Sequence, residues 1–306
     1  MNILINGLHR SGTTFLSRIV NTLPSTFIVK DAFRIPLYYF KTEINRSTNY
    51  PRDLYRLPKA KLMLDKEIKD IKYLTDMVIG DLKSNFLDKT EYTGLLDEIM
   101  KCRQGETYKN LFSRMFNKIK EIEKCDFIGA KTTNMALYAP EVLDSLPNTK
   151  WIEVIRDPRG WRCSAKVSSP GAASAGFWNK AANASLAAAE SHRDRYIIIT
   201  YENLILYPKE TLQQICDFVG NKFSISDNWI ENLTLVEGNG KTWFSNPSYT
   251  KDGKKISGDP NKGIPNEYRI FDNDPVYRWK TRLPRWEKAF FSFATSKNRK
   301  RLRDIT

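Results

Sequence analysis

The sequence is poor in the residues that build disulfide scaffolds, zinc sites and membrane spans. Its 306 residues include four cysteines and two histidines. They form no CxxC pair and no metal-ligand spacing, so we expect reduced, mostly structural thiols and no metal site. No apolar run approaches the roughly 20 residues that a membrane span needs. Met1 leads into a short apolar run at Ile3–Ile5 rather than a secretory signal, so we expect a cytoplasmic protein without a membrane partner.

Positive charge is what the sequence has in excess. Its 49 Lys and Arg residues against 35 Asp and Glu residues give a formal net charge of +14, which favours anionic ligands. The densest basic run is Lys297–Arg303, within a tail (297–306) for which we expect a solvated, frayed end. Charge alone does not establish a nucleic-acid surface, and we expect no nucleic-acid partner. A hydrophobic content of 41% predicts a substantial core rather than disorder.

Short β-prone runs alternate with helical segments along the chain. The first run, Ile3–Ile5, is followed by apolar residues at helical spacing from Phe15 to Leu23, which predicts a strand, a loop and a helix. This alternation is typical of parallel strands joined by crossover helices. We therefore predict an α/β fold: a single three-layer domain over 1–306 with a central, mostly parallel sheet. The later strands are expected at Phe27–Val29, Phe127–Ala130, Trp151–Ile155 and Tyr196–Thr200.

Three segments depart from the alternation. Residues 58–125 have helical periodicity with few Gly or Pro residues, which predicts a helical insertion of two or more helices. Residues 236–284 are rich in Gly, Pro, Asn and Asp, so regular structure should be sparse there, and we interpret the segment as a lid. A mobile loop is expected at Ser168–Gly176, before a helix around Ala181–Glu190.

An anion cradle is predicted between the first strand and the first helix. Residues Gly7–Thr14 have the sequence GLHRSGTT, with the Gly-x-x-x-x-Gly spacing of a P-loop. In such a loop, backbone N–H groups and the positive start of a helix face an anion. Thr13 stands where an NTPase carries the lysine that reaches the outer phosphates of ATP, and a cation, Arg10, lies inside the loop instead. A strand–turn–helix corner that binds nothing is the alternative for so short a motif.

This loop resembles the 5′-phosphosulfate loop of sulfotransferases that use 3′-phosphoadenosine 5′-phosphosulfate (PAPS). The resemblance is to the branch with arginine in the loop, which includes tyrosylprotein sulfotransferases and many bacterial enzymes. It implies a P-loop-like fold and no metal. It also assigns the phosphosulfate group of the donor to Arg10, Ser11, Gly12, Thr13 and Thr14.

A second motif matches the same family. The strand at Trp151–Ile155 leads into Arg156, and Ser164 follows eight residues later. In the family this Arg and this Ser bind the 3′-phosphate, the group that separates PAPS from ATP or ADP. The charge of the ligand agrees with this assignment, because PAPS needs hydrogen-bond donors at two separated ends.

Two further motifs follow in the family's order. Thr200–Leu204 is similar to the strand–helix unit beside the adenine, which implies that Tyr201 contacts the cofactor. Tyr277–Lys280 is a weaker match to the late basic loop that closes over the cofactor, which adds Arg278 and Lys280. Together the matches cover most of the chain, up to about residue 283.

Sulfuryl transfer requires a group that stabilises the charge on the departing phosphate oxygen. We expect Arg10 and Lys131 to do so, because Lys131 follows a predicted strand, and sites of open α/β sheets gather at the carboxyl ends of their strands. The resemblance supports both, since a strand-end lysine recurs in the tyrosylprotein branch. A surface cation is the alternative for Lys131.

The reaction also requires a base. The Arg-loop branch uses a carboxylate shortly after the second strand, and Asp31 lies 21 residues after Arg10, the separation expected there. The family commonly has Glu at this position, and Asp is one methylene shorter; a solvated turn residue is the alternative. His9 is the rival base because its ordinary pKa lies near neutrality, although its place in the cradle favours a role in shaping the loop. His192 is expected at the surface.

The sequence therefore predicts a PAPS-dependent sulfotransferase that sulfates a hydroxyl or amine of a small-molecule acceptor and releases PAP. The alternatives are an ATP-dependent small-molecule kinase and a non-catalytic polyanion-binding protein. Thr13 and the lack of a second magnesium-holding acidic strand end weigh against the kinase. No motif identifies the acceptor or an oligomeric state.

An acceptor pocket is expected between Phe33–Tyr39 and the helical insertion. The loops at 168–176 and 236–265 are the expected lids. Some aromatic residues of these segments are candidates to stack on a substrate, although core packing is the commoner role for such side chains. They are Tyr38, Tyr39, Phe40, Trp178 and Trp243.

Overall fold

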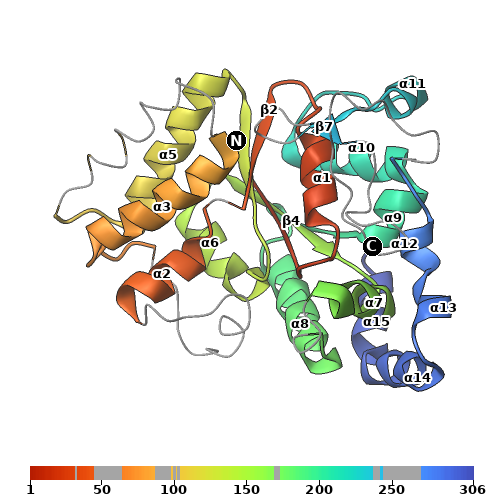
Figure 1. Cartoon of the computed structure of the whole chain (residues 1–306). Coiled ribbons are helices and arrows are strands. Elements are labelled where there is room, and N and C mark those ends of the chain that lie inside the picture. The colour runs from red at the N-terminus through yellow and green to blue at the C-terminus, as the bar shows by residue number, and fades with distance from the viewer. Residues whose placement is uncertain are drawn as a thin grey trace.

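A five-stranded parallel sheet runs through the centre of the computed structural model (Figure 1). The structure describes residues 1–31, 33–44, 64–86, 98, 101, 104–168, 173–236, 242–243 and 270–306. The strand order is β2-β3-β1-β4-β5, and all four neighbouring pairs are parallel, which confirms the predicted α/β fold. The strands are β1 (Asn2–Gly7), β2 (Thr26–Lys30), β3 (Phe127–Lys131), β4 (Thr149–Ile155) and β5 (Tyr196–Thr200).

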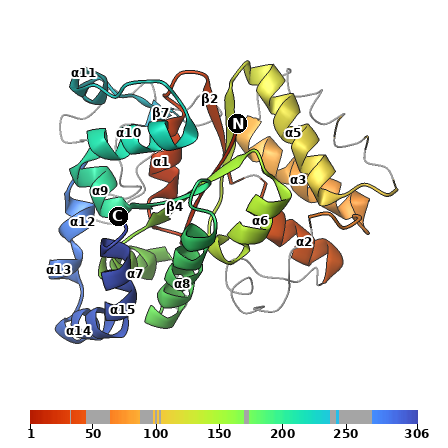
Figure 2. The same ribbon diagram turned by 180° about the vertical axis from the view of Figure 1, so that it is seen from behind.

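Helices lie on both sides of this sheet, as Figures 1 and 2 show from opposite directions. A short antiparallel pair, β6 (Leu235–Val236) and β7 (Thr242–Trp243), lies outside it. The helices of the first half are α1 (Thr13–Val20), α2 (Ile35–Glu43), α3 (Ile71–Phe86), α5 (Tyr108–Glu123), the 3₁₀ turn η2 (Ala136–Tyr138) and α6 (Ala139–Ser145). Those of the second half are α7 (Pro158–Ser168), α8 (Ala175–Ser191), α9 (Tyr201–Leu206), α10 (Pro208–Val219), α11 (Asp227–Glu231), α12 (Asp274–Tyr277), α13 (Trp279–Arg282), α14 (Arg285–Ala294) and α15 (Ser296–Arg303).

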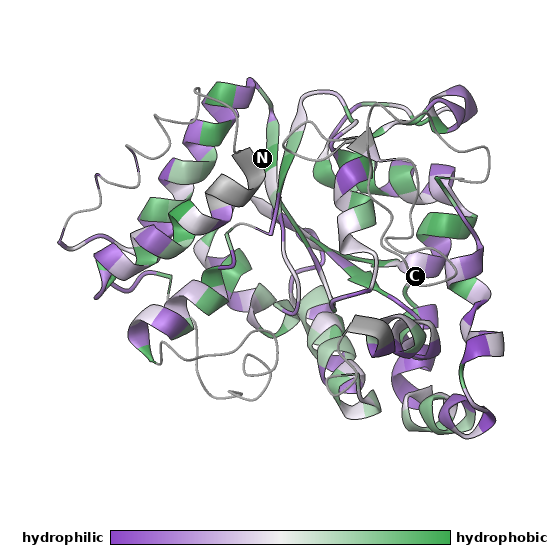
Figure 3. Ribbon diagram, in the orientation of Figure 1, coloured by the Kyte–Doolittle hydropathy of each residue, from purple (hydrophilic) through white to green (hydrophobic). Residues whose placement is uncertain are grey.

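The two faces of the sheet carry two separate apolar cores. Successive side chains of a strand point to opposite faces, so Ile3 and Ile5 pack with α1, α9 and α10, whereas Leu4 packs with α5, α6 and α8. Both faces are covered, which explains why the strands are nearly continuous apolar runs rather than alternating ones. Figure 3 shows hydrophobic stretches on the strands and on the helices that flank them. The three layers are helices, sheet and helices.

The sheet also determines where the predicted site residues lie. Gly7, Lys131 and Ile155 stand at the carboxyl ends of three neighbouring strands, β1, β3 and β4. Asp31 directly follows β2, and Tyr201 directly follows β5. Because parallel strands end at the same edge of a sheet, residues as far apart in the sequence as Gly7 and Tyr201 come together there.

The three segments that depart from the strand–helix alternation are 58–125, 236–284 and 168–176. The insertion at 58–125 contains the long helices α3 and α5, as expected. In the lid segment 236–284, the described parts form β7, α12 and α13, and residues 237–241 and 244–269 lie outside the described residues. The loop expected at 168–176 is shorter than predicted, because α8 already begins at Ala175, where Ser174 caps it by accepting from the Phe177 N–H.

The prediction of a frayed basic tail is wrong for most of its length. Residues 296–303 form α15, which packs on α8 and buries Leu302. Arg301 pairs with Glu190 at 3.0 Å, and Arg299 lies 3.7 Å from Asp157. One apolar anchor and these acidic partners hold a segment whose composition alone indicates a solvated end. Among the described residues, no helix combines the length and the apolar character that crossing a bilayer would require.

Candidate functional site

The loop between β1 and α1 has the backbone shape of an anion cradle. Arg10 and Gly12 have positive φ angles of 68° and 104°, on either side of Ser11. The Ser11 N–H donates to the Leu8 carbonyl (3.0 Å), which closes the turn. Alternation of left-handed and ordinary residues turns successive N–H groups to one side, and the free N–H groups at the start of α1 add a partial positive charge. An anion is the ligand that such a surface favours.

Two features of the structure favour glycine at position 12. Its φ of 104° is left-handed, and a Cβ atom there would lie 2.4 Å from the Tyr201 ring. Tyr201 is fully buried at the start of α9 and therefore forms a wall against the loop. Burial raises the pKa of its phenol, so the side chain is neutral.

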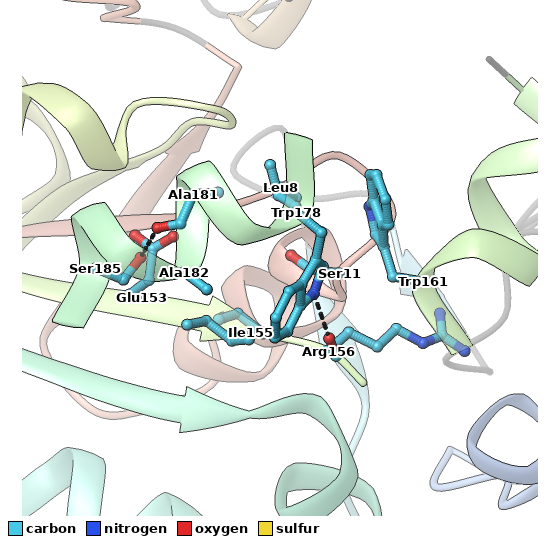
Figure 4. A pocket seen from close by; sticks show the side chains of 11 residues that line it. Leu8, Ser11, Glu153, Ile155, Arg156, Trp161, Trp178, Ala181, Ala182 and Ser185 are labelled. Carbon is cyan, nitrogen blue, oxygen red and sulfur yellow. Dashed lines mark hydrogen bonds between the residues drawn. The ribbon is translucent and has the colours of Figure 1, made fainter. Parts of the chain in front are cut away.

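The guanidinium of Arg156 stacks on the ring of Tyr201. Its Cζ lies 4.3 Å from the centre of the Tyr201 ring, and the residue is only 5% exposed. Nη1 donates to the Arg10 carbonyl (3.2 Å), and Nη2 donates to the carbonyl of Pro275. The Arg156 carbonyl accepts from the Trp178 indole N–H (3.0 Å), as Figure 4 shows. The arginine is thus fixed by the loop, α8, α9 and α12 together.

This buried guanidinium has donor capacity left over. Its Nε has no hydrogen-bond partner in the part of the chain that the structure describes. The nearby carboxyl of Glu202 balances the charge only in part, because burial raises its pKa to about 7. A buried cation without a full counter-charge is costly unless an anion joins it. The geometry therefore suits a phosphate.

Further basic and hydroxyl groups gather around Arg156. Arg10 Nε donates to Ser164 Oγ (3.4 Å), so the Arg10 side chain lies toward α7. Arg278 pairs with Asp274 at 3.2 Å, and burial, with the nearby charges of Arg156 and Arg282, lowers its pKa. The structure thus brings together five residues that the sequence proposed for cofactor binding, from four separate segments. They are Arg10, Arg156, Ser164, Tyr201 and Arg278.

One basic residue of the late loop differs from its prediction, and another was not predicted. Lys280 is exposed, and its ammonium lies 4.7 Å from the centre of the Tyr277 ring, outside the arginine cluster. Arg282 was missed by the sequence reasoning, yet it lies close enough to Arg278 to affect its pKa. The signal that would find it is the helical i,i+4 spacing from Arg278, since the Arg282 N–H donates to the Arg278 carbonyl (2.9 Å).

Asp31 and Lys131 form an ion pair at the neighbouring strand ends. Lys131 Nζ lies 2.5 Å from Asp31 Oδ1, and the Asp31 N–H donates to the Lys131 carbonyl at 2.8 Å. Lys131 is 3% exposed, so it is not the surface cation that was its alternative, and burial lowers its pKa. The Asp31 side chain is 49% exposed and remains open to solvent on one side. One carboxylate is thus oriented by a buried cation and accessible to a second molecule.

His9 is held mainly by its backbone and its ring neighbours. Its N–H donates to Asn134 Oδ1 (3.3 Å), and its carbonyl accepts from the Trp161 indole (2.8 Å). The ring packs against Trp161 and Phe177, with centroids 5.8 and 6.4 Å away. Burial lowers the pKa of His9, which keeps it neutral near pH 7. These contacts suit a residue that shapes the loop.

His192 is less exposed than the sequence predicted. Its ring bridges the end of α8 and α6, because Nε2 lies 2.8 Å from Asp144 Oδ1 and Nδ1 lies 2.8 Å from Ser191 Oγ. His192 therefore has a structural contact and lies near the amino end of β5, at the opposite end of that strand from Tyr201.

The expected metal-free character can be examined where side chains are described. In those segments, no group of three or more His, Cys, Asp or Glu residues is arranged to hold a metal ion. Asp157, the acid that follows β4, pairs with Arg159 at 2.7 Å instead. Three cysteines of the described chain are free and buried, and Cys102 lies outside it. They are Cys125, Cys163 and Cys216.

The aromatic residues proposed for the acceptor pocket have structural contacts. Tyr38, Tyr39 and Phe40 belong to α2 and are buried in the core, and Trp178 is buried beside Arg156. Trp243 lies beneath the guanidinium of Arg18, which is 3.7 Å from the ring centre. Core packing, the commoner role, describes these contacts. Much of both expected lids, 169–172 and 244–265, lies outside the described residues.

The sequence matches the model of the sulfotransferase family over residues 2–224. The chain belongs to the sulfotransferase family. The matched region contains the β1–α1 loop, Lys131, Arg156, Ser164 and Tyr201, and it ends before Arg278. Among curated proteins, none matches this sulfotransferase.

Solved structures share the fold of this sulfotransferase at low sequence identity. The sulfotransferase domain from the curacin biosynthetic pathway is 18% identical, with a TM-score of 0.54, and the alignment covers 96% of each chain. The sulfotransferase domain of the Synechococcus PCC 7002 olefin synthase is 14% identical, with a TM-score of 0.51, and the alignment covers 97% of this chain and 94% of that one. Both likenesses agree with a single α/β domain.

Proposed function

We propose that this sulfotransferase transfers a sulfuryl group from PAPS to a hydroxyl or amine of a small-molecule acceptor and releases PAP. The observation that carries the proposal is the buried guanidinium of Arg156, joined through Arg10 to Ser164 and bordered by Arg278. This cluster lies beside a phosphate-type loop, so two separate anionic groups would find donors. PAPS has both groups, whereas ATP lacks the 3′-phosphate.

The residues present fit the donor at both of its ends. The N–H groups of the loop at 10–14 and the start of α1 would hold the phosphosulfate, and the unpartnered Nε of Arg156 would bind the 3′-phosphate. Ser164 and Arg278 complete the second site, and Tyr201 lies between the two. When bound, PAPS supplies the sulfuryl group and a phosphate leaving group.

At the end of the site where the acceptor would bind, two side chains, Asp31 and Lys131, would take part in the chemistry. In the net reaction, a bond forms between the acceptor oxygen or nitrogen and sulfur, and the bond between sulfur and the phosphate oxygen breaks. Asp31 Oδ accepts the acceptor proton, because it is oriented by Lys131 and open to solvent. The Lys131 ammonium and the start of α1 stabilise the negative charge left on the phosphate. Arg10 was expected to share this task, but its Nε lies toward Ser164, which favours the nucleotide end.

Calorimetry distinguishes this function from its two rivals. The sulfotransferase should bind PAP without magnesium and bind ATP with magnesium far more weakly. Binding of ATP with magnesium in preference to PAP would support the kinase. Steeply salt-dependent binding to heparin without any binding of PAP would support the polyanion-binding protein. Either result would overturn the proposal.

Transfer itself is tested with labelled PAPS and a panel of hydroxyl and amine acceptors. The expected result is labelled product with at least one acceptor class and release of PAP in equal amount. Tight binding of PAP, without transfer to any acceptor of the panel or to water, would limit the protein to nucleotide binding.

A further inference from the structure

Helix α14 presents three large aromatic side chains to solvent. Trp286, Phe290 and Phe293 are 68%, 53% and 84% exposed, although most such residues of the described chain are buried. Their spacing of four and three residues places them on one face of the helix. We call these three residues the aromatic face. Exposed aromatic residues gathered in this way usually mark a contact surface.

The opposite face of α14 holds the helix rigidly on the rest of the molecule. Glu287 is buried and pairs with Lys166 at 2.8 Å and with Arg162 at 3.3 Å, both on α7. Phe291 is buried one turn later, and the helix also contacts α8 and α15. The exposure of the aromatic face is therefore a property of a helix anchored by its other side.

The surroundings of the aromatic face are strongly basic. Residues 278–306 contain ten Lys and Arg residues and two acids, Glu287 and Asp304, of which Glu287 is buried. This stretch accounts for a large part of the net charge of +14. Several of its basic residues are exposed on α13, α14 and α15. They are Lys280, Arg282, Arg285, Lys297, Lys300 and Arg303.

We propose that the aromatic face docks on an anionic lipid surface, with its three rings in the interfacial region and the surrounding Lys and Arg side chains over acidic headgroups. Aromatic residues on one face of a helix with basic residues beside them are the pattern of interfacial binding. Figures 1 and 2 place α14 at an outer corner of the molecule, away from the sheet, where a flat surface can approach it. This departs from the sequence-based expectation of no membrane partner; it concerns peripheral contact and no spanning helix.

A second copy of the chain fits this surface less well. The three exposed rings offer roughly 400 Å² if each side chain has about 200 Å² in total, about half of what one partner buries in a stable protein interface. A symmetric contact would also bring two basic surfaces together, and like charges repel. An anionic bilayer satisfies both the rings and the charges, which favours it as the occupant.

Sedimentation with lipid vesicles tests whether the three aromatic side chains contribute to lipid binding. The full-length chain should bind vesicles with about 30% phosphatidylserine at least about tenfold more tightly than vesicles of phosphatidylcholine alone. The triple substitution Trp286→Ser, Phe290→Ser and Phe293→Ser should weaken this binding by at least about tenfold, because it removes the inserted apolar area. The matched control is Tyr207→Ser, an equally exposed aromatic residue at the start of α10, which should bind as the unchanged protein does.

A second pair of variants tests the charges. Arg285→Gln with Lys297→Gln should weaken binding to the anionic vesicles by roughly 30-fold, at about fivefold for each charge. Lys72→Gln with Lys222→Gln removes the same net charge from exposed sites on other parts of the molecule and should have little effect. Unchanged PAP binding by all of these variants would show that they are folded.

Several results would overturn the proposal. One is absence of binding to the anionic vesicles, and another is binding that survives the triple serine substitution. Equal losses from the two double Gln variants would show a general attraction of a basic protein instead of docking by α14. Concentration-dependent dimers of the free protein that the triple variant abolishes would assign the aromatic face to self-association.

Discussion

The two ends of the candidate site are built in different ways. At the nucleotide end, Arg156 is fixed by bonds to the loop, α8 and α12 and by stacking on Tyr201, and it is almost fully buried. At the acceptor end, Asp31 is held by one ion pair to Lys131 and is half exposed. In the proposed function, binding of the donor would therefore rely on a preorganised, buried set of groups, whereas the chemistry would rely on a few groups that a second substrate can reach.

Asp31→Asn gives the largest expected effect, and it separates the two ends. Turnover should fall by roughly 10²–10⁴, the usual contribution of a general base, because an amide does not take the acceptor proton. PAP affinity should stay within about twofold, since the nucleotide end does not involve Asp31. Steady-state kinetics with labelled PAPS and calorimetry with PAP measure the two quantities.

His9→Gln is the matched comparison for the base. Its effect on turnover should be much smaller, because the ring of His9 packs against Trp161 and Phe177 rather than toward Lys131. Turnover that is unchanged in Asp31→Asn and lost in His9→Gln would transfer the role of base to the histidine.

Arg156→Lys should affect the nucleotide end alone. Lysine keeps the charge but loses the planar guanidinium that stacks on Tyr201 and donates in several directions. PAP binding should weaken by about 100-fold, the value of one strong charge-assisted hydrogen bond. Binding of adenosine 5′-phosphosulfate, which lacks the 3′-phosphate, should weaken by less than about tenfold.

Arg195→Lys is the control for this substitution. Arg195 also donates to backbone carbonyls, those of Leu143 and Pro147, but it lies at the opposite end of β5 from the site. It should leave the affinity for both ligands unchanged. Equal losses of PAP and adenosine 5′-phosphosulfate in Arg156→Lys would show that Arg156 does not bind the 3′-phosphate.

A buried acid, Glu153, lines the same pocket as Arg156 and Ser11. Glu153 on β4 accepts hydrogen bonds at Oε2 from Asn6 Nδ2 (2.7 Å) and Trp151 Nε1 (2.9 Å), and burial raises its pKa to about 7. Asn6 in turn accepts from the Met135 N–H (3.1 Å), so the acid is joined to the turn after β3. Figure 4 shows Glu153 beside Ser185 of α8.

The raised pKa of Glu153 makes stability depend on pH. The folded protein keeps a proton on this carboxyl up to about pH 7, whereas the unfolded chain releases it near its ordinary pKa of 4.5. The contribution to the free energy of unfolding is therefore greatest below the ordinary pKa and falls as pH rises toward 7, by about 2 kcal/mol between pH 5 and pH 7. Glu153→Gln cannot ionise at this position, so its free energy of unfolding should fall by about 2 kcal/mol less than that of the unchanged protein over this range. The fall caused by Glu202, whose pKa burial also raises to about 7, should remain in both proteins.

Urea denaturation over this pH range measures the difference between the two proteins. The exposed Glu190→Gln, which removes a surface pair with Arg301, is the control and should follow the pH dependence of the unchanged protein. Parallel curves for Glu153→Gln and the unchanged protein would show that Glu153 is already ionised in the folded state.

The sequence predicted the parts of the fold and site that depend on local patterns. The parallel strands and the loop at 7–14 follow from apolar runs and residue spacing, which are local properties. The cofactor motifs were assigned from the resemblance to a family. The ion pair of Asp31 with Lys131 and the stacking of Arg156 on Tyr201 depend on which strands become neighbours, and spacing along the chain does not state that.

The wrong prediction for the basic tail and the failure to single out Glu153 have the same origin. The basic tail was interpreted as solvated because its composition is polar, but Leu302 and Asn298 are buried and two arginines have acidic partners, so the helix packs on α8. Glu153 was missed because an acid within an apolar strand needs a partner, and that partner, Asn6, lies 147 positions earlier. Neither the docking of the tail nor the burial of Glu153 can be predicted until the distant segment that supplies the contact is known.

Gly12→Ala gives the smallest expected effect and asks whether the nucleotide end is preorganised. An alanine would be strained at the φ of 104°, and its Cβ would lie 2.4 Å from the Tyr201 ring, so the loop and the ring must move apart. We expect PAP affinity to fall by about tenfold and the free energy of unfolding to fall by about 1–2 kcal/mol. Gly176→Ala is the control, because it lies within α8 with no atom within 4 Å of the new Cβ and should stabilise the protein slightly. If Gly12→Ala binds PAP as tightly as the unchanged protein, the loop adapts to its ligand, and rigidity does not distinguish the two ends of the site.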